Sequence, residues 1–367
     1  GGHGTQYGIT VDTLTAPEQA LEWVRARKAE GSDYIKLVYI PNTRGFPSLD
    51  RATARAVIEA AHAEGLMALV HISTQQAALA MIEDGVDGLV HVFADELASD
   101  ELLQLAVEQE IFVIPTLAVI EAIGGENSDA WAGQVAVDSL ALSPMQEQTL
   151  GASFGQGPGG YQLETALENV RRLHEAGVPI LAGSDAPNPG TAQGLSLHRE
   201  LQLLVRAGLS EQQALDAATR LPTQLFGLDG RGVIEPGARG DLVIIEGNPL
   251  ENIENIMAIR QVIKNGFVVD RSLEIPRSTQ TLDRASLGDF EAGLDAPQGF
   301  AWSGTDDTMA NGKSEVAIQR VRREPGDSAY ALEINPIVRS GFPYPWAGGS
   351  IMSAAGVDIS GYKALRF

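Results

Sequence analysis

An apolar run that ends on a single carboxylate constrains the fold of this chain most. Residues 178–182 (VPILA) have the length and the bounding turn residues of a fully buried strand. The run stops at Gly183-Ser184-Asp185, and a loop rich in proline and glycine follows. In α/β barrels, side chains that carry chemistry lie at the carboxyl ends of buried parallel strands. We therefore expect a parallel α/β fold with a site around Asp185.

Three earlier strand-like runs carry polar side chains in a similar way. Lys36 lies within the first of them, and His71 and His91 close the second and the third. Repetition of strand, helix and strand at this spacing predicts parallel strands joined by right-handed crossovers. The predicted strands span residues 33–40, 67–71, 88–91, 111–116 and 178–183. The predicted helices between them span residues 17–30, 49–64, 74–84, 98–109 and 162–176.

Five strands are fewer than the eight that a closed barrel needs, so we expect the missing strands upstream of a start that has no initiator Met. The final run, GYKALRF, is strand-like and suggests a second truncation. Residues 118–160 are interpreted as an insertion. Helices are predicted at 196–207 and 210–220, the second with Ser210 as its N-cap and Gln213 at capping-box spacing.

The sequence changes character after these helices. Short β runs punctuated by glycine, proline and Asn-Gly predict hairpins in a small composite β domain. The last region has glycine-rich turns and no convincing helix, which predicts an antiparallel β-sandwich of the jelly-roll kind. The predicted domains are a barrel over 1–230, the β domain over 231–272, a linker over 273–288 and a partial sandwich over 289–367.

Charge and cysteine content exclude several classes of site. The net charge of −22 disfavours nucleic acid and an anionic membrane surface as partners. No apolar stretch is long enough for a transmembrane helix. Because the chain has no cysteine, disulfides, thiol catalysis and cysteine-ligated zinc are excluded. The compartment stays open, with export slightly favoured over the cytoplasm.

Four side chains form the main candidate site, and each has a structural alternative. Lys36 is either a lysine on an exposed strand face or a buried amine that is modified or contacts a metal. His71 and His91 are either hydrogen-bonded core histidines or ligands. Neighbouring parallel strands lie about 4.8 Å apart, within reach of one ion at ~2.0–2.1 Å from each nitrogen. Asp185 is a turn former, or a metal ligand and general base.

The other histidines are weaker candidates. His62 and His174 are interpreted as structural, the latter near a helix C-terminus where a cation is favoured. His198 begins the helix after Asp185, and His3 lies in a glycine-rich turn. Both His3 and His198 are expected to contact substrate.

These segments together resemble a known family. Residues 1 to about 272 are similar to the C-terminal two-thirds of an amidohydrolase-superfamily enzyme, in the imidazolonepropionase-like and Xaa-Pro dipeptidase-like group. The resemblance is carried by DYIKLVYI, GLMALVHIST, GVDGLVHVF and VPILAGSDAPNPG in this order, and by RGVIEPGARGDLVIIEGNPL near the end. It implies a TIM-type (β/α)8 metallo-hydrolase barrel, of which strands 4–8 are present here, with a composite β domain.

The resemblance also implies roles for the four candidates. Lys36 matches a lysine that becomes N-carboxylated and bridges two divalent metals, usually zinc. His71 and His91 match metal ligands on the next two strands. Asp185 matches an aspartate that binds metal and takes the proton from the attacking hydroxide. The family's His-x-His pair has no counterpart in this sequence, so the chain either omits an N-terminal piece or is not a complete enzyme.

Residues 289–367 resemble the first part of a galactose-binding-like sandwich of the CIA30 or carbohydrate-binding kind. Trp302, Tyr344 and Trp346 are either a sugar-stacking platform or core aromatics. Asp306 and Asp307 are either calcium ligands or ordinary turn residues.

Three functions remain open from the sequence. The first is a metal-dependent hydrolase of a carbon–nitrogen bond in a small-molecule substrate, such as a dipeptide, an N-acyl amino acid or a cyclic amide, with two zinc ions per complete site. The second is a non-catalytic carbohydrate-binding protein with an incomplete barrel. The third keeps the metal site but cleaves an ester, lactone, carbamate or phosphotriester. A carbohydrate partner and a homo-oligomer are left open.

Overall fold

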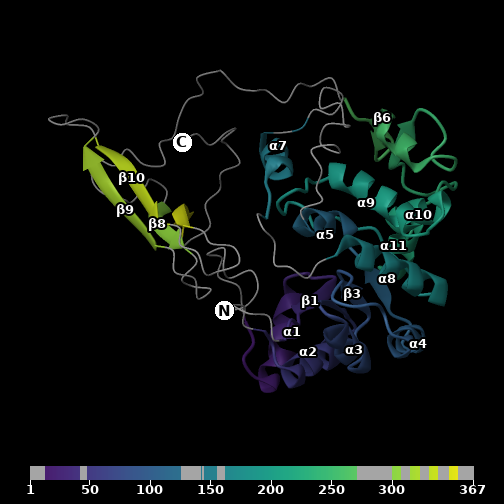
Figure 1. Cartoon of the computed structure of the whole chain (residues 1–367), viewed down its shortest axis with the longest axis horizontal. Helices are drawn as coiled ribbons and strands as arrows, with labels where there is room; N and C mark the ends of the chain where they lie inside the picture. The colour runs from purple at the N-terminus through teal and green to yellow at the C-terminus, as the bar shows by residue number, and fades with distance from the viewer. Residues whose placement is uncertain are drawn as a thin grey trace. The chain divides into compact units, whose positions relative to one another are not determined.

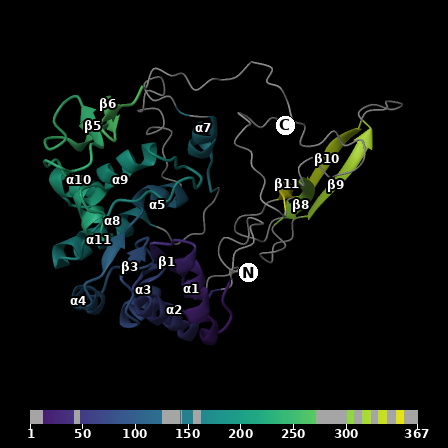
Figure 2. The same cartoon turned by 180° about the vertical axis from the view of Figure 1, so that it is seen from behind.

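The chain divides into two compact units in a computed structural model (Figures 1 and 2). One unit comprises Leu14–Asn42 and Ser48–Pro276, and the other comprises Gly1–Thr13, Thr43–Pro47 and Arg277–Phe367. The structure describes residues 13–41, 48–124, 142, 144–154 and 162–270, together with the backbone of four strands at 300–306, 315–322, 330–337 and 347–353. His3 lies outside the described residues.

A parallel sheet organises the larger unit. Its order is β1–β2–β3–β4, which confirms the parallel sheet predicted from the strand–helix repeat. The register pairs Lys36 with Leu69, Leu69 with Gly88 and Gly88 with Phe112. A closed barrel stays a prediction. The strands are β1 (Tyr34–Val38), β2 (Met67–His71), β3 (Gly88–Val90) and β4 (Phe112–Ile114).

The strand predicted at 178–183 is much shorter in the structure. It reduces to one parallel bridge, between Val113 and Ile180. Val113 donates its N–H to the carbonyl of Pro179 and accepts from the N–H of Leu181. Pro179 has no N–H with which to extend the ladder, and the N–H of Ala182 donates to Ala217 instead of to a strand. The segment nevertheless continues the sheet beyond β4.

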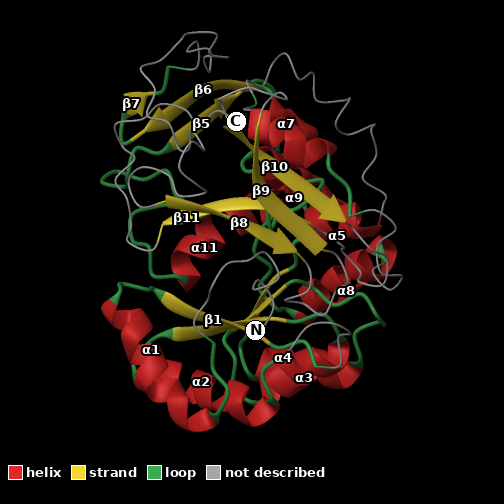
Figure 3. Ribbon diagram, turned by 90° about the vertical axis from the view of Figure 1, so that its left-hand side faces the viewer, coloured by secondary structure: helices red, strands yellow, loops and turns green. Residues whose placement is uncertain are grey.

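Short helices pack along one face of this sheet, as Figure 3 shows for α1 to α4. Side-chain caps explain where several of them begin: Asp50, Thr74 and Ser99 each accept a hydrogen bond from the N–H three residues later. The alternating residues Ile35 and Leu37 of β1 are buried in the apolar core together with residues of α2. The elements are η2 (Pro17–Gln19), α1 (Ala20–Ala29), α2 (Arg51–Ala63), α3 (Gln75–Glu83) and α4 (Asp100–Glu108).

The segment interpreted as an insertion contains helices at both of its described ends. A helix begins directly after β4 at Leu117, and the interpretation of residues 118–160 as an insertion stays a prediction. The apolar run LAVI there has the composition of a buried helix as well as that of a strand. The helices are α5 (Leu117–Gly124) and α7 (Pro144–Gly151).

Three further helices and a short one follow. Gly177 ends the first with φ 96°, and the capping box of Ser210 and Gln213 is confirmed. The helix predicted at 210–220 ends earlier, because Thr219 leaves the helical region (φ −130°, ψ −85°) and its hydroxyl donates to the carbonyl of Leu215. The helices are α8 (Leu163–Ala176), α9 (Leu195–Arg206), α10 (Glu211–Ala218) and α11 (Arg220–Leu225).

A three-stranded antiparallel sheet follows, in agreement with the predicted hairpins. Asn265 (φ 53°) and Gly266 (φ 80°) form the two-residue turn of the second hairpin, where both positions need the left-handed conformation. The N–H of Gly266 donates to the carbonyl of Gly240, and a Cβ on Gly240 would lie 2.9 Å from that nitrogen. The elements are β5 (Leu242–Ile245), η4 (Ile253–Met257), β6 (Ile259–Lys264) and β7 (Phe267–Val268).

The smaller unit contains two antiparallel strand pairs, β9 with β10 and β8 with β11. The sandwich and the domain boundaries stay predictions, and Asp307, Tyr344 and Trp346 lie outside the described residues. The strands are β8 (Phe300–Asp306), β9 (Glu315–Arg322), β10 (Tyr330–Ile337) and β11 (Ala347–Ser353). Among the described helices of the whole chain, none is long and apolar enough to cross a membrane.

Candidate active site

The predicted side chains meet at the carboxyl ends of the parallel strands. His71 is the last residue of β2 and His91 follows β3, so the register of the sheet makes them neighbours. Their rings lie edge to face, with centroids 4.4 Å apart and planes at 77°. Nε2 of His91 lies 4.0 Å from Oδ2 of Asp185. The structure therefore brings together three residues that span 114 positions of the chain, from His71 to Asp185.

Lys36 acts on this group through its charge. Its positive charge lowers the pKa of Asp185 and so opposes the effect of burial on that carboxyl. The lysine itself is exposed, whereas Ile35 and Leu37 on the other face of β1 are buried. β1 is an edge strand of the described sheet, which agrees with an exposed lysine at this position, and the modification of Lys36 or its contact with a metal stays a prediction.

Asp185 forms a turn and faces His91, and its role as a metal ligand and general base stays a prediction. The Nδ2 group of Asn188 donates to Oδ2 of Asp185 at 2.9 Å and to its carbonyl at 2.7 Å, which makes Asp185 a turn former. Its side chain is 37% exposed and faces His91. Burial raises the pKa of Asp185, and the charge of Lys36 limits the rise. A carboxyl with a raised pKa beside an imidazole is suited to proton transfer.

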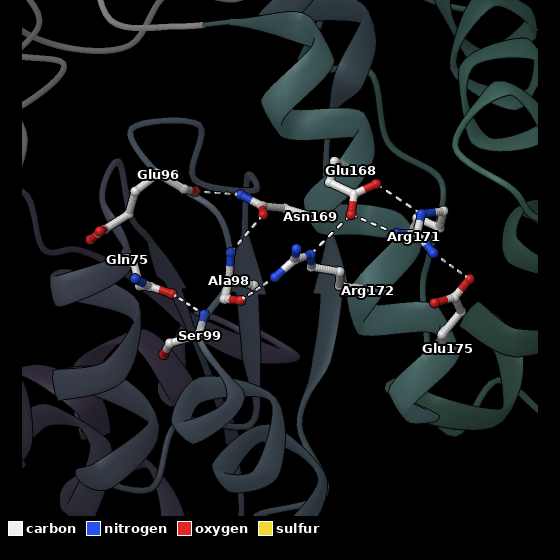
Figure 4. A network of polar contacts seen from close by, with 9 residues as sticks. All are labelled: Gln75, Glu96, Ala98, Ser99, Glu168, Asn169, Arg171, Arg172 and Glu175. Atoms are coloured by element: carbon white, nitrogen blue, oxygen red, sulfur yellow. Dashed lines mark hydrogen bonds and ion pairs between the residues drawn. The ribbon is translucent and has the colours of Figure 1, made fainter.

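A polar network fixes the loop that follows His91 (Figure 4). Asn169 of α8 is fully buried, and its Nδ2 donates to the carbonyls of Phe93 and Glu96 while its Oδ1 accepts from the N–H of Ala98. Arg172 donates to the carbonyl of Ala98 at 3.1 Å. The network ties the chain beyond β3 to α8 and holds the backbone that leads out of the site.

Two buried polar residues near His91 were missed from the sequence. Thr116 is 3% exposed, and its Oγ1 lies 2.6 Å from Nδ1 of His91. Glu200 is fully buried and accepts from the N–H groups of Leu117 and Ala118. Thr116 ends the predicted strand 111–116, so the rule that singled out the two histidines would have found it. Glu200 lies four residues after Ser196 and three before Leu203, on the apolar face of α9.

Glu200 predicts a pH dependence of stability. Burial raises the pKa of Glu200 from 4.5 to about 8, against the opposing effect of the Leu117 and Ala118 amides. The folded state therefore takes up a proton, and the free energy of unfolding falls as pH rises between about 5 and 8. Glu200→Gln is expected to flatten this fall, as measured by urea unfolding across that range. The exposed Glu211→Gln is the control, and identical slopes for Glu200→Gln and the native protein would contradict the assignment.

The remaining histidines lie elsewhere. His198 is in the first turn of α9, half-buried, and burial lowers its pKa. Its contact with substrate stays a prediction. His62 pairs with Asp87 at 2.9 Å, and His174 lies in the last turn of α8.

The donor chemistry of the site fits a divalent metal in part. Imidazole and carboxylate are ligands that Zn²⁺ takes, and His71, His91 and Asp185 supply them on neighbouring segments. In the part of the chain that the structure describes, however, no three histidine, aspartate or glutamate side chains form a group able to hold an ion. The described residues thus supply part of a ligand set.

The fold and the sequence of this chain are similar to those of known proteins. A parallel α/β sheet with imidazole and carboxylate groups at its carboxyl edge is the arrangement of barrel-type α/β proteins with a site at the strand ends. The amidohydrolase family profile matches residues 10–269, and the chain belongs to this family. The match ends at residue 269, and the galactose-binding-like resemblance of residues 289–367 stays a prediction.

Individual relatives agree with this family. The chain is 27% identical to ochratoxinase of Aspergillus niger over 262 residues, covering 68% of this chain and 48% of the relative. It is 42% identical to imidazolonepropionase of Cutibacterium acnes over 76 residues, covering 20% and 19%. A crystal structure of a Xaa-Pro dipeptidase shares the fold, with TM-score 0.57, 22% identity and coverage of 74% of this chain and 65% of that one. The chain spans about half the length of the longer-matching curated relatives.

Proposed function

We propose that this protein is a metal-dependent hydrolase that cleaves a carbon–nitrogen bond in a small-molecule substrate. The convergence of His71, His91 and Asp185 at one edge of the parallel sheet carries the proposal. Membership of the amidohydrolase family supports it. A dipeptide, an N-acyl amino acid or a cyclic amide is the proposed substrate class, and the similarity to a Xaa-Pro dipeptidase supports the dipeptide.

In this proposal His71 and His91 hold a divalent metal, with Asp185 as a further ligand. Lys36 would be a further ligand once its Nζ has added CO2 and lost a proton to form a carbamate. Carboxylation replaces the positive charge of the amine by a negative one, which removes its repulsion of a cation. A bound divalent metal supplies a Lewis acid that polarises the scissile carbonyl.

In this proposal a residue of the chain transfers the proton from the attacking water to the leaving group. Asp185 accepts a proton from the attacking water and passes it to the leaving nitrogen. The hydrogen bonds from Asn188 keep the carboxylate near His91 during both steps.

Metal analysis tests the proposal. The full protein purified with zinc is expected to contain about two ions per chain, and removal of metal by a chelator is expected to abolish hydrolysis of N-acyl amino acids and dipeptides. His91→Ala and Lys36→Ala are expected to lower the metal content because each removes a ligand. His174→Ala, at the end of α8, is the control. Less than about half an ion per chain, with no loss in Lys36→Ala, would rule out the two-metal site.

A further inference from the structure

Three successive strand ends around the site share an unusual backbone conformation. His91 (φ 71°), Thr116 (φ 54°) and Asp185 (φ 52°) are all left-handed, although none is glycine. Only two other non-glycine residues in the described ranges have positive φ. Threonine is poorly suited to it because its side chain branches at Cβ. Such strain persists only where the surroundings hold the backbone in place.

A hydrogen bond joins the first two of these residues. Oγ1 of Thr116 lies 2.6 Å from Nδ1 of His91, and both side chains are buried. The strands beneath them are tied as well: the N–H of His91 donates to the carbonyl of Ile114, and that of Val92 donates to Pro115. The left-handed turn at Thr116 thus places its hydroxyl next to the imidazole of His91, which follows the neighbouring strand.

The carboxyl group of Glu200 bonds to the two residues that directly follow this turn. Its Oε1 accepts from the N–H of Leu117 at 3.0 Å, and its Oε2 accepts from the N–H of Ala118 at 2.8 Å. These are the first two amides of α5, which begins directly after Thr116. One residue earlier on α9, Arg199 forms a two-pronged ion pair with Glu121 of α5, at 2.9 and 2.5 Å. Figure 1 shows α5 and α9 side by side.

We propose that Thr116 and Glu200 are positioning residues for His91: Glu200 fixes the turn, and the Thr116 hydroxyl accepts a hydrogen bond from Nδ1–H of His91. This bond selects the tautomer that is protonated on Nδ1 and has its lone pair on Nε2. Nε2 is the nitrogen that faces Asp185. Because neutral imidazole binds a metal through an unprotonated nitrogen, the inference rests on the proposed function for its catalytic meaning.

The tautomer can be measured without metal and without activity. In the metal-free full protein, the ¹⁵N shifts of the His91 ring, assigned by comparison with His91→Gln, are expected to report the Nδ1–H form. Thr116→Val keeps the branched shape but removes the hydroxyl, so a shift toward the Nε2–H form is expected. Thr116→Ser restores the hydroxyl and is expected to restore the native spectrum. Thr53→Val is the matched control, because Thr53 is also buried and bonds to Asp50 on α2.

Zinc affinity gives a second readout. Thr116→Val is expected to weaken zinc binding by about 10- to 100-fold, whereas Thr116→Ser stays close to the native value. An Nε2–H tautomer in the native protein, or a Thr116→Val spectrum equal to the native one, would overturn the inference even if zinc binds. If the tautomer follows the hydroxyl as expected but no zinc binds, the positioning stands and the proposed function fails.

Discussion

Asp185→Asn is expected to lower the turnover of the metal-loaded protein by roughly 10²- to 10⁴-fold, the range for loss of a general base. The amide preserves the size of the side chain and an oxygen that can accept from Asn188. It cannot accept the proton of the attacking water, because an amide is not basic. The loss should therefore fall on kcat more than on KM. Steady-state kinetics on an N-acyl amino acid or dipeptide that the native protein cleaves would measure it.

The result needs a control for metal loss, because Asp185 is also a proposed ligand. Metal content measured on the same sample separates a protein that is loaded but slow from one that is empty. Asp229→Asn, an exposed aspartate after α11, controls for the change of charge. A loaded Asp185→Asn protein with turnover within about tenfold of the native value would remove Asp185 from the proton transfer.

Asn169→Asp is expected to destabilise the larger unit by roughly 3–5 kcal/mol, since two buried carbonyls lose their donor and a carboxylate is left in their place. In the native protein one amide satisfies Phe93, Glu96 and Ala98 together. An aspartate can still accept from Ala98 but cannot donate to the two carbonyls. Urea unfolding followed by circular dichroism would measure the loss.

The matched control is Asn252→Asp. Asn252 is exposed and only accepts, from the N–H of Glu254 at the start of η4, so aspartate can replace it at that cap with little change. If Asn169→Asp unfolds at the same urea concentration as Asn252→Asp, the network of Figure 4 does not stabilise the fold.

Local chemistry explains which parts of the fold could be predicted. The strand end at His71, the helix stop at Gly177 and the capping box at Ser210 depend on residues close in sequence, and the structure has each of them. The strand predicted to end at His91 ends one residue earlier, at Val90. The predicted strand at 178–183 failed because Pro179 interrupts the ladder, although proline is visible in the sequence. Proline inside an apolar run favours a shorter strand than the one predicted.

The site required contacts that no local pattern contains. Lys36 is exposed because of where β1 lies in the sheet, which depends on strand order rather than on its neighbours Ile35 and Leu37. Glu200 is buried because the amides of Leu117 and Ala118, more than 80 positions away, meet its carboxyl. The sequence shows that Glu200 lies on the apolar face of a helix, but it does not show the two amides that bond to its carboxyl group.

Two sets of contacts hold α5 to α9. The first two amides of α5 bond to the buried carboxyl of Glu200, and Glu121 in its next turn pairs with Arg199, so we expect α5 to move little. Asp185, in contrast, lies on a Pro- and Gly-rich loop that leads into the same helix α9. In the proposed hydrolase, differences in substrate size are therefore expected to be accommodated by that loop, while α5 stays fixed beside Thr116.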